Sequence, residues 1–247
     1  MMRNLLLVGG PGHEFDEIAE SLDRVLRTAE VATTVVTHPD EMIEALVSTD
    51  SGGGYDLLTV HALHWGMAAD RYAHLRDEHA YHLRSADAGV IGDFVSSGGG
   101  LLALHTAVVC FDAEPIWHEL CGAAWHWERS SHPSLGAAEV SITEEGRDHP
   151  ITAGVGDFSI VDEIYGFLDE QPGLVPLLVG SHGGRRHPLL WARAVGAGRV
   201  VTDLLGHDAG SIDHPVHGPM LCRAARWAGG ATTESVVDMG PVEEVRP

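Results

Sequence analysis

Short apolar runs that alternate with segments of helical spacing constrain the fold of this chain more than any other feature. The runs cover residues 4–8, 31–37, 55–60 and 101–104, and the segments with helical spacing cover residues 13–28, 41–47 and 79–97. Runs of about four to eight apolar residues suit β-strands, and strands that are apolar throughout suit a sheet covered on both faces. The alternation of strands with helices predicts an α/β fold with a mainly parallel central sheet.

The second half of the chain is less regular. Strands are predicted over residues 137–142, 158–161 and 174–179, followed by a hairpin of residues 189–194 and 199–204 and a closing helix over residues 215–228. A turn is predicted at residues 51–54, where serine precedes three glycines. The sequence shows no repeat and no interdomain linker, so residues 1–230 are expected to form a single domain and residues 231–247 a tail or one edge segment.

Composition excludes several classes of partner. The net charge of −21 disfavours nucleic acid and anionic membranes as partners. No apolar run approaches the ~20 residues of a membrane-spanning helix, and the first apolar run meets glycine and then acid, so it is interpreted as a strand and not as a signal peptide. The three cysteines show no CxxC spacing and are interpreted as reduced thiols of a cytoplasmic protein.

Histidines and carboxylates lie at or just after the ends of several predicted strands. They are His13, His61, His64, His105 and His207, together with the adjacent pair Asp162 and Glu163. The carboxyl ends of parallel strands gather at one edge of an open α/β sheet, and ligands bind in the crevice there. We therefore expect these dispersed side chains to share one pocket.

His105 occupies the most specific of these positions. In GGGLLALHTA, a glycine-rich helix end, a buried strand and a polar residue at a sharp turn indicate a nucleophile elbow, with His105 at its tip. Histidine there can act as a base, an acid or a metal ligand. The alternative is a histidine hydrogen-bonded in the core. Cys110, five residues later, is interpreted as a small buried hydrophobe.

The other catalytic candidates follow two later strands. His207 and Asp208 come after the last strand, and Asp208 either acts in acid–base chemistry or caps the next helix. Asp162 and Glu163 would point to opposite faces of a strand, so at most one faces a given pocket. The predicted catalytic residues are His105, His207, Asp208 and Glu163.

A further set of residues is expected to contact the ligand or a metal. The predicted substrate contacts are His13, His61, Trp125, His126, Asp162 and Tyr165. The aromatic and polar segment 125–133 suits sugar stacking, and it also suits ordinary loop packing. His13, His105 and His207 with one carboxylate would suit Zn²⁺, Mn²⁺ or Fe²⁺. The glycines of residues 9–12 match neither GxGxxG nor a Walker loop, so no nucleotide cofactor is expected.

Taken together, these motifs resemble the ThuA-like, or trehalose-utilisation, family. The resemblance rests on GGPGHE, GGGLLALHTA, LCGAAWHWERSSHP, DHPIT, VDEIYGFL, PLLWARAVGAGRVVTDLLGHD and RAARWAGG, which occur in this order within residues 1–230. It implies a flavodoxin-like three-layer sandwich related to class I glutamine amidotransferases. Those enzymes carry a catalytic cysteine at the elbow, where this chain has His105, so amidotransferase chemistry is not expected.

The resemblance also implies a role in disaccharide and glycoside catabolism, beside oxidoreductases that make 3-keto sugars. The chain is therefore expected to be an enzyme that cleaves or isomerises an oxidised glycoside by histidine and carboxylate chemistry, with metal assistance. Three alternatives stay open: a non-catalytic sugar- or metal-binding protein, a hydrolase that uses Cys110, and a subunit that supports a partner enzyme. A small-molecule sugar is the expected ligand, and a homo-oligomer is the expected assembly.

Overall fold

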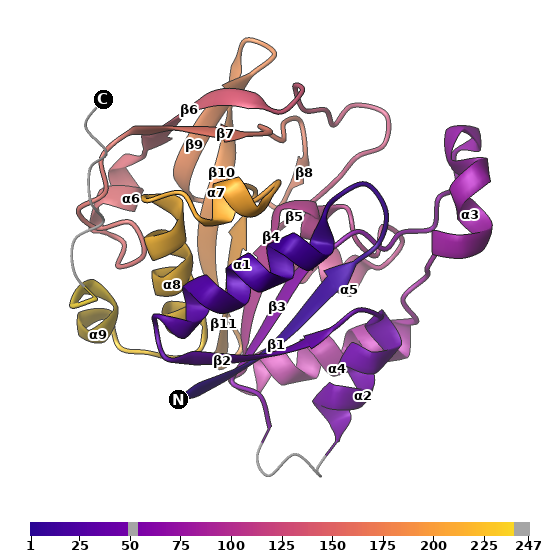
Figure 1. Cartoon of the computed structure of the whole chain (residues 1–247), viewed down its shortest axis with the longest axis horizontal. Helices are drawn as coiled ribbons and strands as arrows, with labels where there is room; N and C mark the ends of the chain where they lie inside the picture. The colour runs from indigo at the N-terminus through magenta and orange to yellow at the C-terminus, as the bar shows by residue number, and fades with distance from the viewer. Residues whose placement is uncertain (49–53, 240–247) are drawn as a thin grey trace.

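A single mixed sheet organises the computed structural model of this chain, which describes residues 1–48 and 54–239. The nine strands of this sheet lie in the order β2-β1-β3-β4-β11-β10-β9-β6-β7 (Figure 1). Their bounds are Met2–Gly9 (β1), Val31–Val36 (β2), Leu57–Ala62 (β3), Gly100–Leu104 (β4), Gly136–Ile142 (β6), Phe158–Asp162 (β7), Pro176–His182 (β9), Arg185–Val195 (β10) and Gly198–Asp203 (β11). A separate short pair joins β5 (Ala123–Ala124) to β8 (Asp169–Glu170).

The expectation of a mainly parallel sheet holds for only one part of it. Strands β2, β1, β3, β4 and β11 pair in parallel, whereas β11, β10, β9, β6 and β7 pair antiparallel. Two residues separate β9 from β10, and two separate β10 from β11. Connections this short allow only hairpins, because a parallel connection needs a dozen or more residues. The chain is therefore a mixed α/β protein, and its flavodoxin-like character stays a prediction.

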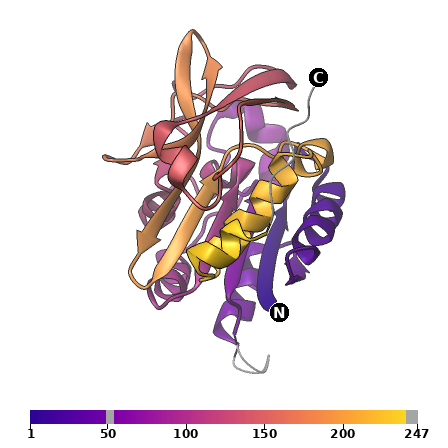
Figure 2. The same cartoon turned by 90° about the vertical axis from the view of Figure 1, so that its left-hand side faces the viewer.

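Two groups of helices pack against the parallel part of the sheet. Helices α1 (Phe15–Arg27), α7 (Ala209–Ile212) and α8 (His217–Ala228) contact one another, and α4 (Ser85–Ser96) contacts both α2 (Pro39–Val47) and α5 (Pro115–Cys121). Figure 2 shows the two groups on either side of the strands. The remaining helices are η1 (Asp70–Tyr72), α3 (Ala73–His79), η2 (His105–Val108), α6 (Glu144–Asp148) and α9 (Thr233–Val237).

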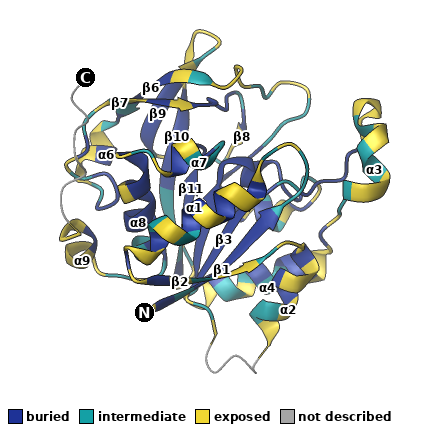
Figure 3. Ribbon diagram, viewed as in Figure 1, coloured by how far each residue is buried: buried dark blue, intermediate teal, exposed yellow. Residues whose placement is uncertain are grey.

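Helix α1 shows why these sequences fold as they do. Phe15, Ile18, Leu22 and Leu26 recur at helical spacing and are all buried, so they form one apolar stripe facing the sheet (Figure 3). Acidic residues occupy its first turn and arginines its last turn, which complements the helix dipole. Packing of the apolar stripe therefore fixes the loop before α1 next to the sheet edge.

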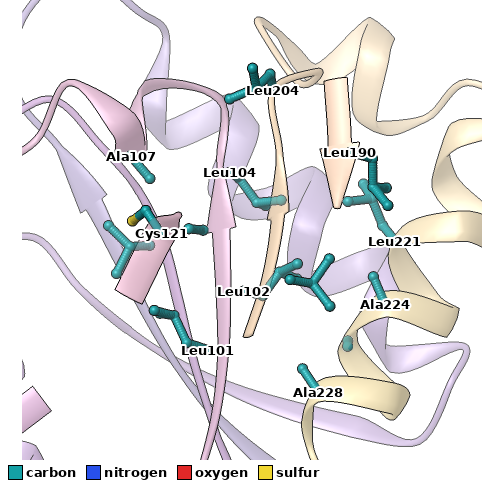
Figure 4. Close-up of a cluster of buried hydrophobic side chains, with 14 of the residues drawn as sticks. Leu101, Leu102, Leu104, Ala107, Cys121, Leu190, Leu204, Leu221, Ala224 and Ala228 are labelled. Carbon is teal, nitrogen blue, oxygen red and sulfur yellow. The ribbon is translucent and has the colours of Figure 1, made fainter. Parts of the chain in front are cut away.

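The core of the sheet is a continuous layer of aliphatic side chains. Leu101, Leu102 and Leu104 of β4 are fully buried, and the close-up in Figure 4 shows them with Leu190, Leu221 and other core residues. Burial of a leucine side chain stabilises the fold by about 1.5–3 kcal/mol. This layer makes β4 a rigid support for the residue that follows it, His105.

Two boundaries differ from the expectations. The helix expected over residues 79–97 begins only at Ser85, after the short helix α3. Residues 231–239 are more than a tail or edge segment, because they include helix α9, which packs against α8 and buries Val236. The turn predicted at residues 51–54 and the end of the predicted tail lie outside the described residues, apart from Gly54. Within residues 1–48 and 54–239, no helix combines the length and the apolar character needed to cross a membrane.

Candidate functional site

Four polar side chains from distant parts of the chain converge at the carboxyl edge of the parallel strands. They are His13 after β1, His105 after β4, Glu163 after β7 and His207 after β11. One nitrogen or oxygen atom from each lies within 4.8 Å of the corresponding atom of every other. The predicted convergence therefore holds for three of the five histidines, His13, His105 and His207, whereas His64 lies outside the group. We call His13, His105, Glu163 and His207 the imidazole cluster.

His105 has the backbone geometry of an elbow. It is the first residue of η2, directly after β4, and its φ of 44° lies in the left-handed region that non-glycine residues seldom adopt. Its Nδ1–H donates a hydrogen bond of 2.8 Å to the carbonyl oxygen of Leu204, since a carbonyl can only accept. This bond leaves the lone pair on Nε2, which is buried and has no hydrogen-bond partner in the described residues.

The loop after β1 brings His13 to the same place. Gly10 has a φ of +106°, and a Cβ atom there would lie 2.2 Å from the carbonyl oxygen of Leu63, so only glycine fits. Both ring nitrogens of His13 are buried without a hydrogen-bond partner in the described part of the chain. The His13 ring lies 4.7 Å from that of His207 and 5.3 Å from that of His105, measured between ring centroids.

Burial keeps His13 and His105 neutral. It lowers the pKa of His13 to about 4, and the neighbouring His61 and His207 add to the effect. Burial also holds the pKa of His105 well below its ordinary value, again reinforced by nearby imidazoles. Neutral imidazoles keep a free lone pair, and a lone pair is what a metal ion requires of a histidine ligand.

Glu163 supplies the negative charge of the site. Its carboxylate oxygens lie 3.3 Å from His207 Nδ1, 3.8 Å from His105 Nε2 and 3.1 Å from His132 Nδ1. Burial is the largest single influence and favours a raised pKa for Glu163, but the hydrogen bond from His132 and the electrostatic effect of His132, His207 and His13 together outweigh it and lower that pKa. The carboxylate is therefore ionised at neutral pH.

His132 is a site residue that the sequence-based prediction missed. Ser131 and Gly166 form an isolated β-bridge, and this bridge places His132 beside Tyr165 at a ring-centroid distance of 5.1 Å. His132 lies at the rim of the site with 37% of its side chain exposed. The only signal in the sequence was its place in the histidine-rich segment 125–133, which does not reveal a partner.

Asp162 fixes the backbone of the site instead of facing a ligand. Its carboxylate accepts hydrogen bonds from the amides of Glu163 (2.7 Å), Gly206 (2.8 Å) and His207 (3.4 Å), and from the hydroxyl of Ser211. Asp162 is only 1% exposed, so these bonds occupy it fully. Asp162, which was predicted to contact the substrate, therefore lies behind the cluster, where it holds the backbone amides of Glu163 and His207.

A buried polar network continues behind Asp162. His217 Nδ1 lies 3.2 Å from the hydroxyl of Ser211, and His217 Nε2 lies 3.1 Å from the Asp203 carboxylate. His217 and Asp203 are fully buried. Burial opposes the charged form of His217, but the charge and hydrogen bond of Asp203 outweigh it and raise the pKa of His217.

This buried pair is expected to make stability depend on pH. Because the pKa of His217 is raised above 6.5 on folding, protonation stabilises the folded state below about pH 6.5, and the contribution disappears as the pH rises through the raised pKa. His217→Gln should therefore lower the free energy of unfolding more at about pH 6 than at about pH 9, measured by urea unfolding. His74→Gln, at an exposed position, is the control. A cost of His217→Gln that is equal at both pH values would contradict this assignment.

The structure places the remaining predicted residues around the cluster. His61 is fully buried below it, and its Nε2–H donates to the carbonyl oxygen of Gly206 at 2.7 Å. Tyr165 packs its ring 4.6 Å from that of His105. Of the two roles open for Asp208, the structure shows the helix cap, since its carboxylate accepts the Ser211 amide at the start of α7.

Trp125 and His126 lie further out than the residues above. The Trp125 ring contacts Tyr165 and His132 at centroid distances of 5.2 and 6.0 Å, so Trp125 borders the site. His126 is instead bonded within its own turn, where Nδ1 accepts the Glu128 amide. His126 also lines a cavity together with Trp125 and Trp127.

Cys110 is placed as a structural residue. Its thiol is fully buried, donates to the carbonyl oxygen of Ala62 at 2.8 Å and accepts the His64 amide at 3.2 Å. Burial raises its pKa to about 12, so no thiolate nucleophile is present at neutral pH. We expect iodoacetamide to leave Cys110 unmodified in the folded protein and to modify it after denaturation, as read by mass spectrometry. Rapid alkylation of Cys110 in the folded protein would restore the thiol hydrolase as a candidate.

Comparisons with known proteins agree with this architecture. The fold is similar to that of a ThuA-like protein from Parabacteroides merdae (TM-score 0.72, 17% identity, covering 93% of this chain and 90% of that one). It is also similar to a cytoplasmic protein from Salmonella typhimurium LT2 (TM-score 0.61, 15% identity, covering 91% and 99%). A third similar structure is the β-galactosidase of Halorubrum lacusprofundi, where the match covers 92% of this chain but 30% of the enzyme (TM-score 0.58, 13% identity).

These likenesses define an α/β protein with a ThuA-like fold. The model of the ThuA family, described as trehalose utilisation, matches residues 8–228, and the chain belongs to this family. That description indicates a carbohydrate-related role. No curated protein sequence matched the chain.

Proposed function

We propose that the imidazole cluster binds a divalent metal ion through His13, His105 and His207, and that the protein cleaves an oxidised glycoside there. The observation that supports this most strongly is the set of buried ring nitrogens without hydrogen-bond partners: both nitrogens of His13, Nε2 of His105 and Nδ1 of His207. A buried polar atom without a hydrogen-bond partner destabilises the folded state. Three imidazoles with such atoms in one cluster are suited to coordinate a single cation. The bond from His105 Nδ1 to Leu204 is the kind of support that orients a metal-bound histidine.

The donor set fits Zn²⁺, Mn²⁺ or Fe²⁺. Imidazole nitrogens are ligands that these ions accept, and each of the three histidines offers one nitrogen within 4.8 Å of the others, with the Glu163 carboxylate beside them. When bound, such an ion supplies positive charge that stabilises a developing oxyanion. The side chains of the protein itself then bind the substrate and transfer the proton.

Glu163 is the residue that we assign as the base. In a glycoside with a ketone at C3, the proton on C2 is acidic. The Glu163 carboxylate takes that proton, and the electron pair of the C2–H bond forms an enolate with the C3 oxygen. Collapse of the enolate forms the C1–C2 double bond and expels the C1 substituent, which receives a proton. Addition of water across the double bond then completes hydrolysis.

The environment of Glu163 suits this task. His132 holds one carboxylate oxygen at 3.1 Å, which keeps the carboxylate ionised and oriented, while the other faces His105 and His207. Asp162 fixes the amides of both Glu163 and His207, so the base and one imidazole keep a constant separation.

Turnover of a 3-keto glucoside by protein purified without a histidine tag tests the proposal. We expect elemental analysis to find a transition metal or zinc, chelation to abolish cleavage and added Zn²⁺ or Mn²⁺ to restore it. Glu163→Gln should retain the three imidazoles and lose turnover by about a hundredfold or more. Metal binding without turnover of 3-keto glucosides would instead support the non-catalytic binding protein.

A further inference from the structure

The chemistry proposed for the imidazole cluster needs a second proton-transfer group. Glu163 takes the proton from C2, but an alcohol oxygen is a poor leaving group unless it receives a proton as the C1–O bond breaks. Glu163 cannot supply that proton at the outset, because its lowered pKa keeps it ionised. The imidazoles of His13, His105 and His207 are the proposed metal ligands, so their lone pairs are committed to the ion. A separate acid is therefore expected beside Glu163.

His132 lies beside Glu163 with one ring nitrogen free. Its Nδ1 is 3.1 Å from a carboxylate oxygen of Glu163 and 2.9 Å from the carbonyl oxygen of Pro133. Both of these oxygens accept hydrogen bonds, so Nδ1 carries a hydrogen atom whether the ring is neutral or charged. In the described part of the chain, Nε2 of His132 has no hydrogen-bond partner. Nε2 is therefore the atom that can exchange a proton with a ligand.

The surroundings of His132 orient its ring and leave it open on one side. The ring lies 5.1 Å from that of Tyr165 and 6.0 Å from that of Trp125, measured between centroids. The His132 side chain is 37% exposed, whereas that of Glu163 is 10% exposed. The pair thus runs from the interior of the cluster to its rim. A leaving group departs toward the exposed side of this pair, where His132 lies.

The electrostatic environment favours the charged form of the His132 ring. The hydrogen bond to Glu163 is the largest influence, and it raises the pKa of His132 above its ordinary value against the effect of burial. An imidazole that titrates near the working pH can both give and take a proton. In this respect His132 differs from His13, whose pKa burial lowers to about 4.

We propose that His132 acts through Nε2 as the general acid of the elimination and as the general base of the hydration that follows. This role rests on the proposed function and adds a catalytic residue to it. In the elimination, Glu163 removes the C2 proton, the C1–O bond breaks, and Nε2–H of the charged His132 ring protonates the departing oxygen. The C1 substituent leaves as a neutral alcohol.

The hydration returns both groups to their starting states. Nε2 of the neutral His132 ring takes a proton from water as the water oxygen bonds to C1. The electrons of the C1–C2 double bond form the enolate again, and the protonated Glu163 gives its proton back to C2. The net reaction consumes one water molecule, releases one alcohol and leaves His132 charged and Glu163 ionised.

This role predicts that the effect of replacing His132 depends on the leaving group. Methoxide is strongly basic and needs a proton to leave, whereas 4-nitrophenolate is stable as an anion and leaves without one. Methyl and 4-nitrophenyl 3-keto glucosides are therefore the two probes. Single turnovers with the protein in excess are followed by the release of methanol or nitrophenolate, which reports the elimination without the hydration.

His132→Asn is the informative variant, because the asparagine amide still offers Glu163 an N–H but has no acidic proton to give. We expect this variant to release methanol about a hundredfold or more slowly than the wild type, and nitrophenolate less than about tenfold more slowly. Its metal content should equal that of the wild type. His74→Asn, at an exposed position on α3, should leave both rates unchanged.

Two results would overturn the role of His132 and leave the proposed function in place. Equal losses with the two glucosides would show that His132 only positions Glu163. An unchanged rate of methanol release in His132→Asn would show that the proton comes from elsewhere. Failure of the metal-loaded wild type to cleave either glucoside would instead overturn the proposed function, and the role of His132 with it.

Discussion

Replacing His105 with alanine is expected to lower the affinity for Zn²⁺ by about a hundredfold or more and to abolish turnover. His105 is one of the three imidazoles of the cluster, and its buried Nε2 has no hydrogen-bond partner in the described residues, so its loss removes a donor nitrogen. Competition with a chromophoric chelator measures the affinity, and elemental analysis of the purified variant gives the metal content.

His64→Ala is the matched control for this change. His64 is also a buried histidine after β3, with an unpartnered Nε2 among the described residues, but it lies outside the cluster. The His64→Ala substitution removes the same side-chain volume as His105→Ala without removing a proposed metal ligand. Retention of wild-type metal affinity by His105→Ala, or an equal loss in His64→Ala, would show that the cluster is not the metal site.

Replacing Asp162 with alanine is expected to destabilise the protein by about 3–5 kcal/mol, which is large for one residue. The change leaves three backbone amides and a serine hydroxyl without their acceptor in a buried position, and each unsatisfied donor carries a desolvation cost. It also releases the backbone of Glu163 and His207, so metal affinity should fall as well. Urea unfolding gives the first effect and metal titration the second.

Asp208→Ala provides the comparison in the loop after β11, whose amides Asp162 holds. Asp208 accepts one amide hydrogen bond as the cap of the short helix α7, so its loss should cost about 1 kcal/mol. If the two variants had similar free energies of unfolding, Asp162 would not hold the backbone amides of Glu163, Gly206 and His207 as described.

The carboxyl edge of the sheet could be predicted from the sequence because the relevant signals are local. Apolar runs fixed β1, β3 and β4, and each run leads to the polar residue that follows it, as in the elbow at His105. Parallel strands place their carboxyl ends at one edge of a sheet, and this rule predicted the convergence of His13, His105 and His207.

The rest of the site depends on pairings between distant segments that carry no local signature. His132 reaches Glu163 only through the bridge between Ser131 and Gly166, and the Asp203–His217 pair joins a strand to a later helix. The hairpin of β10 and β11 was predicted and is confirmed, but the antiparallel pairing of β9, β6 and β7 was missed, because periodicity identifies a strand without its partner. The cap formed by Asp208 was one of two predicted roles, but the choice between them, and the bonds that Asp162 accepts, required knowledge of which backbone amides lie within reach.

The mixed direction of the sheet divides the site between two structural units. The three imidazoles follow β1, β4 and β11 of the parallel part, whereas the carboxylate follows β7, the outermost strand of the antiparallel part. The bonds of Asp162 to Gly206 and His207 tie the end of β7 to the loop after β11, so they oppose flexing of the sheet along the β11–β10 boundary. Loosening this tie, by natural variation or by engineering, would shift the acid relative to the imidazoles without any substitution at the positions proposed to hold the ion.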